Sequence, residues 1–426
     1  MIVGGYGKNR LFGDAGNDII WLGDQSDTGN VSALNPTGTR NVKSPSNASN
    51  AGGFASGGSG HDIIIGTDQG ETMFGGAGDD TMQGFQGSDI MYGEGGNDYI
   101  SASSENDFDK KIFGGDGNDY IEIMGDGETA NDLHGGRGND KMYGGRGPDD
   151  MYGGDGDDIL RGGNGDDEIW GGEGDDILAG GNNAAGDLFQ DVLRGGPGND
   201  TLYGGNSSDR EGGRDNRVDS KYLYGDEGDD IIFSSDDLNF EYIWGGTGDD
   251  VIRGGNRVIN QFINGNEGDD IIRPGRNGET NSDVQSSKIR GGKGDDTISP
   301  SNIVFNEDGS INFDDSTFGS RGHAGIEWDG GEGDDIIWGN RDSQDDSLYL
   351  GGNGDDTFYP GYSPDNNSNV RYVGQGGKDY FDLNLFGDAG SLRANYYVWG
   401  DWGYGPEDDR YNTDLQYGDT NLEKKL

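Results

Sequence analysis

Paired carboxylates recur along this chain at a spacing that suits the binding of a hard cation. The stretch Gly153–Trp170 reads GGDGDDILRGGNGDDEIW, one nine-residue phrase written twice, with two adjacent aspartates in each phrase. Two unit charges ~4 Å apart repel by about 4 kcal/mol at an effective dielectric of 20, so stacked turns of this kind need a counter-charge. Hard cations prefer carboxylate and backbone carbonyl oxygens as ligands, and glycine lets a turn aim its carbonyls inward.

The phrase is part of an internal repeat, Gly-Gly-x-Gly-x-Asp, that extends from residue 4 to residue 379. Its eighth position is apolar in every complete phrase, and a second apolar position lies two residues before many of the phrases. This pattern predicts short strands that bury one residue per pass, joined by glycine-rich turns, with neighbouring turns completing the core. The eighth-position residues are Ile20, Ile64, Met82, Met91, Ile100, Ile121, Met142, Met151, Leu160, Ile169, Leu178, Leu202, Ile232, Ile252, Ile272, Ile298, Ile337, Phe358 and Phe381, and the flanking ones are Met73, Ile112, Leu133, Leu193, Leu223, Ile243, Ile263, Ile289 and Trp328.

Composition narrows the class of protein. The chain has 426 residues, 88 of them glycine, a formal net charge of -51 and only 29% hydrophobic residues. Such values are typical of a disordered chain, but a disordered chain has no need to keep apolar residues at fixed positions of a repeat. There is no cysteine, which excludes disulfides and zinc-thiolate sites. We expect no binding to nucleic acid, because the chain is strongly acidic. We expect no membrane insertion, because no stretch approaches the ~20 apolar residues of a membrane span.

The phrase Gly-Gly-x-Gly-x-Asp-x-U-x, where U is large and apolar, resembles the RTX, or haemolysin-type, calcium-binding nonapeptide repeat over about residues 4–381. The resemblance implies an all-β fold, a right-handed parallel β-roll or β-helix solenoid of stacked turns of ~18–21 residues, with calcium in the turn loops. It also implies that the sixth-position aspartate and the loop carbonyls at the first and third positions bind the ion. We expect roughly 10–20 calcium ions per chain.

Spacing divides the repeats between two edges of the expected roll. The motif edge keeps the phrase once per turn, whereas the insert edge carries irregular inserts and keeps a short run at Asp149 and Asp167, with a poorer match at Asp89. We predict that the second aspartate of a pair, such as Asp158 and not Asp157, is the ligand. The motif-edge ligands are then Asp62, Asp80, Asp98, Asp119, Asp140, Asp158, Asp176, Asp200, Asp230, Asp250, Asp270, Asp296, Asp335, Asp356 and Asp379. Asp18 is a further predicted ligand, Asp149 and Asp167 are the insert-edge ligands, and the carbonyl ligands belong to Gly135, Arg137, Gly153, Asp155, Gly171 and Glu173.

Two regions are predicted. Residues 1–380 form the roll, with loop insertions on one edge, the longest at about 24–56 and 299–325, and residues 381–426 form an aromatic-rich cap or tail. The inserts are either tolerated loops or a binding face. The tail either covers the last turn or offers a surface to carbohydrate or another partner, with aromatic residues Tyr396, Tyr397, Trp399, Trp402 and Tyr404.

Enzyme signatures are scarce, and we assign no catalytic residue. HExxH, GxSxG, GxxxxGK[ST] and a cysteine nucleophile are absent, and the paired aspartates recur along the chain, whereas an active site is usually singular. His61 and His134 fall within or beside repeats and are expected to be structural.

Two functions of different classes fit the repeat. One is an extracellular, calcium-dependent structural or adhesive protein, a component of a surface layer or filament that contacts itself or a surface polysaccharide. The other is the accessory and secretion module of a larger secreted enzyme or toxin. Both imply an extracellular or cell-surface location, because weak oxygen sites fill at the roughly 10⁻⁴–10⁻³ M calcium affinities of extracellular modules. The N-terminal residues enter the repeat at once, without a visible signal peptide.

Overall fold

The computed structural model describes residues 1–4, 8–23, 53–103, 108–181, 190–205, 220–235, 240–255, 258, 260–275, 286–299, 303–305, 311–313, 326–339, 347–359, 369–382, 395–399 and 410–412. Every regular element in these ranges is a β-strand, and they contain no helix long and apolar enough to cross a membrane. The chain forms two compact units, unit 1 with residues 1–184 and 190–197, and unit 2 with residues 185–189 and 198–426.

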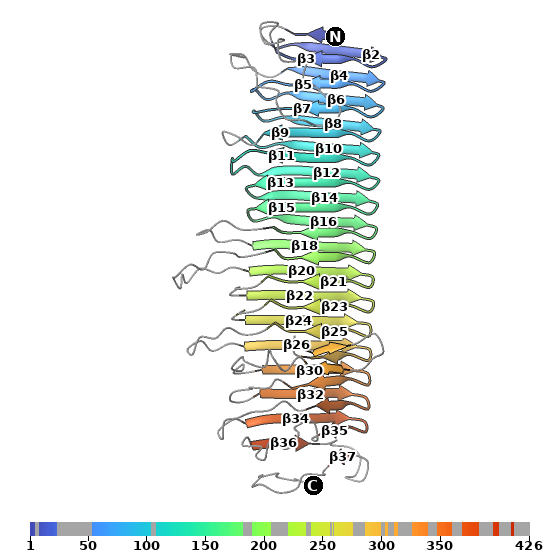
Figure 1. The fold of residues 1–426 in the computed structure, drawn as a ribbon, viewed down its shortest axis with the longest axis vertical. Coiled ribbons are helices and arrows are strands. Elements are labelled where there is room, and N and C mark those ends of the chain that lie inside the picture. The colour runs from blue at the N-terminus through green and yellow to red at the C-terminus, as the bar shows by residue number, and fades with distance from the viewer. Residues whose placement is uncertain are drawn as a thin grey trace. The chain divides into compact units, whose positions relative to one another are not determined.

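Unit 1 is a parallel solenoid in which strands alternate between two sheets (Figure 1). The odd-numbered sheet contains β1 (Ile2–Val3), β3 (Ile19–Trp21), β5 (Ile63–Ile65), β7 (Thr81–Gln83), β9 (Tyr99–Ser103), β11 (Tyr120–Met124), β13 (Lys141–Arg146), β15 (Ile159–Asn164) and β17 (Ile177–Ala179). The even-numbered sheet contains β2 (Arg10–Ala15), β4 (Phe54–Ser59), β6 (Thr72–Ala77), β8 (Ile90–Gly95), β10 (Lys111–Asp116), β12 (Asn131–Arg137), β14 (Asp149–Asp155), β16 (Glu168–Glu173) and β18 (Gln190–Pro197).

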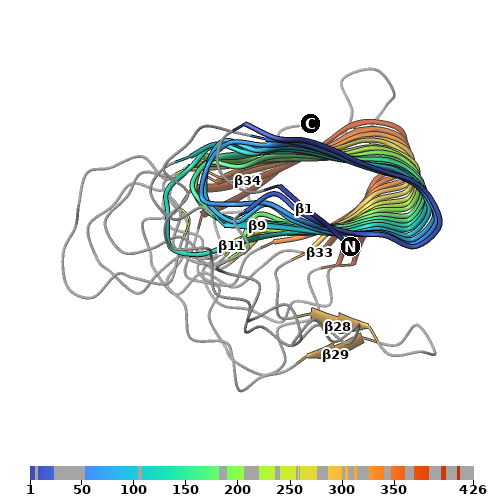
Figure 2. The ribbon, with the colours of Figure 1, turned by 90° about the horizontal axis from the view of Figure 1, so that it is seen from above.

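Unit 2 repeats this plan. Its odd-numbered sheet contains β19 (Thr201–Tyr203), β21 (Ile231–Phe233), β23 (Val251–Arg253), β25 (Ile271–Arg273), β27 (Thr297–Ile298), β31 (Ile336–Trp338), β33 (Thr357–Tyr359), β35 (Tyr380–Asp382) and β37 (Arg410–Asn412). Its even-numbered sheet contains β20 (Ser220–Glu227), β22 (Phe240–Thr247), β24 (Asn260–Glu267), β26 (Ser286–Lys293), β30 (Ile326–Glu332), β32 (Ser347–Asn353), β34 (Asn369–Gly376) and β36 (Asn395–Trp399). An antiparallel pair, β28 (Ile303–Phe305) and β29 (Ile311–Phe313), lies apart from both sheets (Figure 2).

The core of each unit is the double apolar column predicted from the repeat. All the eighth-position residues named above are fully buried, and the flanking residues are at most 1% exposed. Like stacks on like between turns, as Leu133 does on Met151 and Ile243 on Ile263. The predicted parallel β-solenoid is thus confirmed, since a thin core is completed only by the turns above and below.

From β2 to β34, the connection from an even-numbered strand of the two sheets to the next odd-numbered strand is the six-residue motif turn. In the turn 153–158, Gly154 and Gly156 have φ angles of 121° and 124°, values that disfavour any residue with a Cβ. The glycines of the phrase are therefore required by the backbone, and these turns make up the motif edge.

The insert edge is formed by the opposite connections, from an odd-numbered strand to the next even-numbered one. The two longest expected inserts, at about 24–56 and 299–325, follow β3 and β27 in chain order. Most of their residues lie outside the described ranges, as do Trp402 and Tyr404 of the tail, so the placement of the inserts on one edge and the role of the tail as a cap remain predictions.

His134 belongs to a ladder of stacked rings on the outer face of the even-numbered sheet of unit 1. Its ring centroid lies 4.7 Å from that of Phe113 and 4.7 Å from that of Tyr152, which stacks on Trp170 at 4.5 Å. Its Nε2 is 2.7 Å from Asp132 Oδ1. These contacts agree with a structural position for His134.

Candidate metal centres

The sixth-position aspartates of the motif edge stack into one hydrogen-bonded ladder in each unit. The backbone N–H of Asp140 donates to Asp158 Oδ1 at 2.7 Å, and the N–H of Asp158 donates to Asp176 Oδ1 at 2.7 Å. The ladder of unit 1 extends through Asp18, Asp62, Asp80, Asp98, Asp119, Asp140, Asp158 and Asp176. The ladder of unit 2 extends through Asp200, Asp230, Asp250, Asp270, Asp296, Asp335, Asp356 and Asp379.

Turn length does not disturb the ladder. Successive aspartates are separated by 18 residues at Asp62 and Asp80, yet by 39 residues at Asp296 and Asp335, where the N–H···Oδ1 distance is still 2.8 Å. The motif turn therefore fixes the geometry of the carboxylate, whatever the length of the rest of the solenoid turn.

The second carboxylate oxygen of these aspartates is buried and accepts no hydrogen bond from the described part of the chain. Such an oxygen costs free energy unless a donor or cation compensates it. Oδ2 is in this state in Asp62, Asp80, Asp98, Asp119, Asp140, Asp158, Asp230, Asp250, Asp270, Asp296, Asp335 and Asp356. One ordered polar atom per turn is thus left for a ligand.

A backbone carbonyl from the next turn points at the same place. A Cβ built on Gly153 would collide with Asp158 Oδ2 and with the carbonyl oxygen of Gly171, and one on Gly135 would collide with Asp140 Oδ2 and the Gly153 carbonyl. The clash recurs along the motif edge, so each turn holds a space that only a glycine leaves open. Its lining of carboxylate and carbonyl oxygens fits calcium.

The six predicted carbonyl ligands fall into two groups. Those of Gly135, Gly153 and Gly171 converge on the aspartate of the preceding turn, as just described. Those of Arg137, Asp155 and Glu173 accept backbone N–H groups from Gly117, Gly138 and Gly156, at 2.7, 2.7 and 2.6 Å, and keep one lone pair.

Sequence reasoning missed a further set of carbonyls. The carbonyl oxygens of Gly136 and Gly138 face Gly154 and Gly156 of the next turn so closely that a Cβ at either glycine would collide with them. The alternation of glycine at the second and fourth positions was the available signal. Among the described residues no three His, Cys, Asp or Glu side chains gather at one point, so side chains alone would not complete the oxygen shell of an ion.

Burial raises the pKa of the ladder carboxyls, because the charged form loses its hydration. The pKa reaches about 7 for Asp80, Asp98 and Asp140, and about 8 for Asp230 and Asp356. Hydrogen bonds from neighbouring N–H groups oppose the shift, and adjacent aspartates add to it at most of these positions. The ladder is thus an array of carboxylates that needs protons or cations.

The neighbouring aspartate of each pair faces the other way. Asp158 is 1% exposed, whereas Asp157 is exposed and its Oδ1 accepts the N–H of Asp175 at 3.1 Å. The structure therefore separates the paired carboxylates, one toward the turn interior and one on the surface, and the ligand role of the inner one remains a prediction.

The insert edge reproduces the turn at Asp149 and Asp167. Both side chains are fully buried, and the N–H of Asp149 donates to Asp167 Oδ1 at 3.0 Å. Asp149 Oδ1 also accepts the Nδ2–H of Asn131 at 2.6 Å. Burial, with Asp167 as the next cause, raises the pKa of Asp149 to about 9.

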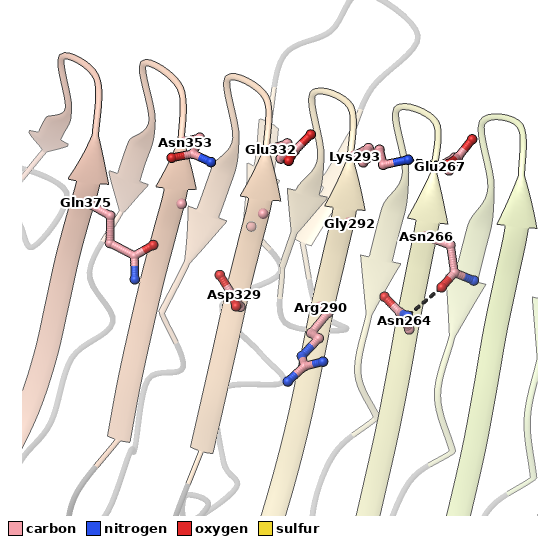
Figure 3. Close-up of a pocket in the computed structure, with 13 residues that line it drawn as sticks. Asn264, Asn266, Glu267, Arg290, Gly292, Lys293, Asp329, Glu332, Asn353 and Gln375 are labelled. Carbon is pink, nitrogen blue, oxygen red and sulfur yellow. Dashed lines mark hydrogen bonds and ion pairs between the residues drawn. The ribbon is translucent and has the colours of Figure 1, made fainter.

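A polar groove of about 560 Å³ lies on the outer face of unit 2, over β24, β26, β30, β32 and β34 (Figure 3). Asn264, Arg290 and Asp329 line it from three neighbouring strands, and Asn264 donates to Asn266. Asn266 and Gln375, which also line it, have φ angles of 83° and 78° at the second motif position, where the repeat prefers glycine. The groove thus includes two amide side chains at positions where a left-handed backbone costs free energy for a residue with a Cβ.

Comparison with known protein families supports the reading of the repeat. The family model of the RTX calcium-binding nonapeptide repeat matches residues 1–29, 54–82, 65–100, 111–122, 126–160, 152–184, 185–210, 222–241, 237–256, 260–277 and 287–300, more than half of the chain. No curated protein matches the sequence as a relative.

Proposed function

The chain belongs to the RTX calcium-binding nonapeptide-repeat family, and from this premise we propose that it is an extracellular structural protein whose folding depends on calcium. The repeat solenoid is a calcium-binding, non-catalytic structural domain. Our proposal extends this to the whole chain, to which we assign no catalytic role. RTX repeats occur in proteins exported by type I secretion, which supports the location.

One observation carries the proposal: twelve buried carboxylates of the two ladders, named above, have an Oδ2 that no donor in the described part of the chain satisfies. Calcium would supply the missing positive charge. The aspartates would bind it through Oδ2, the first-position carbonyls of the next turn would complete the oxygen shell, and the glycines would keep the space open. Because the site needs two stacked turns, ion binding and folding are coupled.

Circular dichroism during a calcium titration tests this proposal. We expect a loss of β-structure in excess EDTA at neutral pH and a cooperative gain when calcium is added. Asp158→Asn should raise the calcium concentration at the midpoint, whereas Asp157→Asn, on the exposed neighbour, should leave it nearly unchanged. Full β-structure in EDTA would overturn metal-coupled folding.

The assembly role and the accessory-module role predict different effects of calcium on the oligomeric state of the protein. A surface-layer or filament component should form ordered, higher-order species when calcium is added, and sedimentation velocity would detect them. A secretion module of a larger enzyme or toxin should remain a folded monomer. We favour the first role, and a monomer at high protein and calcium concentrations would favour the second.

The groove of unit 2 favours a second candidate function, attachment to a neutral polysaccharide. Amide, guanidinium and carboxylate groups offer donors and acceptors to hydroxyl groups, and Trp244 lies next to Asn264 in strand register. Affinity electrophoresis in gels containing dextran, a neutral polysaccharide, tests it with Arg290→Ala. Lys288→Ala is the control, since Lys288 pairs with Glu327 at 3.4 Å outside the groove. Equal mobility of all three proteins in every gel would refute attachment through this groove.

A further inference from the structure

The insert edge of unit 1 has its own column at the register of the sixth motif position. Backbone N–H groups donate to the next side chain from Glu71 to Asp89 at 3.0 Å, and from Lys110 to Asn131 at 3.1 Å. The column consists of Glu71, Asp89, Lys110, Asn131, Asp149, Asp167 and Asp191. Lys110 is the member without a side-chain oxygen to accept a hydrogen bond, so the ladder has a break at this level.

Lys110 brings a positive charge into the Asp89 turn. The side chains of Lys110 and Asp89 are both fully buried, and Lys110 Nζ is 3.5 Å from Asp89 Oδ2. The same ammonium donates to the carbonyl oxygen of Gly87, inside that turn. A buried ammonium is rare unless it is paired, and here it contacts one carboxylate and one turn carbonyl.

The Asp89 turn otherwise has the geometry of a metal turn. A Cβ on Gly84 would lie 2.6 Å from Asp89 Oδ2, as one on Gly144 would collide with Asp149 Oδ2. Asp89 Oδ1 accepts an N–H from the preceding turn, as the motif-edge aspartates do. The difference is the Lys110 side chain, which approaches from the following turn.

We propose that Lys110 is a tethered cation that takes the place of calcium in the Asp89 turn. This inference rests on the proposed calcium sites of the other turns. An ammonium supplies positive charge and contacts the same two kinds of oxygen as the ion would, carboxylate and carbonyl. The Asp89 turn therefore stays closed without calcium and binds none.

The column of unit 2 also contains a lysine and a buried carboxylate. At the same register Lys221 lies opposite Glu241 on the neighbouring strand, and both are buried. The Glu241 carboxylate accepts the backbone N–H of Gly255 at 2.9 Å and the side-chain amide of Gln261. Donors within the protein thus satisfy this buried carboxylate.

Counting bound ions in two matched variants tests the inference. Equilibrium dialysis with radioactive calcium should give the same number of ions for Asp89→Asn as for the unaltered protein. Asp80→Asn, on the motif edge, should lose at least one ion. Loss of an ion in Asp89→Asn would overturn the role of Lys110. An unaltered protein that binds no calcium would instead refute the proposed function.

Reversing the charge gives the second test. Lys110→Asp restores the acidic residue of the repeat and should bind one more ion than the unaltered protein. If that variant does not fold in calcium, Lys110→Met and Lys110→Met/Asp89→Asn decide the question by thermal melting. The single variant leaves a buried carboxylate unpaired and should melt at lower temperature, and the second change should restore most of the loss. A double variant that melts as low as the single one would contradict the inference.

Discussion

The motif edge and the insert edge share one turn geometry but neutralise their buried carboxylates differently. On the motif edge every level of each ladder holds an aspartate, and all of these aspartates except Asp18 are buried. On the insert edge the same register holds a lysine at Lys110, an amide at Asn131 and a hydroxyl at Ser287. This difference in side chains indicates that the backbone of the turn does not itself require calcium. The requirement comes from stacking carboxylates without internal donors.

The largest effect that separates the edges is expected from pH in the absence of calcium. Burial raises the pKa of the motif-edge carboxyls above the usual 3.8, to about 7 for Asp140 and about 8 for Asp296. A raised pKa favours the folded state while the carboxyl is protonated, so this stabilisation is present below the unfolded pKa and is lost as pH rises through about 7 to 8. In EDTA, circular dichroism should show a folded solenoid near pH 5 and loss of structure near pH 8.

Calcium should reverse this trend, since its ligands must be deprotonated and calcium affinity should rise with pH. A metal-free protein with the same β-structure at both pH values would contradict the ladder as the source of calcium dependence.

A smaller but still severe effect is expected from lengthening a motif turn. Ten Gly and Ser residues inserted between Gly78 and Asp79 would separate the fourth-position glycine from the Asp80 ligand. The same insertion between Asp315 and Ser316, within a solenoid turn that already has 39 residues between its ladder aspartates, should cost on the order of 1 kcal/mol in loop closure. Ion counting should show loss of sites in the first variant and little change in the second. Equal loss in both would mean that the edges are equivalent.

The sequence predicted the repeating parts of the molecule because the repeat itself encodes them. The core column, the parallel stacking and the inward second aspartate all follow from a phrase in which glycine, aspartate and an apolar residue keep fixed positions. Asp158 and Leu160, for example, lie where the phrase predicts them, one in the turn and one in the core.

The role of Lys110 could not be read from the phrase. Lys110 follows Asp89 by 21 residues, and the solenoid turn between them includes the irregular segment 101–111. This turn length brings Lys110 to the register of the sixth motif position. A three-dimensional register is needed to see that one of two adjacent lysines is buried and the other exposed. The carbonyls of Gly136 and Gly138 were missed for a similar reason, since the glycines at the second and fourth positions indicate a close approach but not which atom makes it.

A moderate effect is expected from adding one methyl group to the motif edge. Gly153→Ala would push a Cβ against Asp158 Oδ2 and the Gly171 carbonyl, and overpacking of this kind costs about 1–3 kcal/mol. Gly95→Ala is the matched control, because its Cβ would meet only the Gly76 carbonyl at 4.0 Å. Thermal melting in calcium should show a lower transition for Gly153→Ala alone. Equal melting temperatures for Gly153→Ala and Gly95→Ala would show that the turn accommodates a methyl group beside Asp158 without cost.

The smallest effect is expected at Lys111, the neighbour of the proposed tethered cation. Its side chain is 58% exposed and its Nζ lies 3.1 Å from Asp132 Oδ2 on the next strand. Exposed ion pairs of this kind contribute about 0–1 kcal/mol, because water and salt screen them. Lys111→Met should therefore melt within a few degrees of the unaltered protein, in calcium or EDTA, whereas Lys110→Met should not. If the two variants have the same melting temperature, the buried ammonium of Lys110 does not stabilise the insert edge more than the exposed ammonium of Lys111 does.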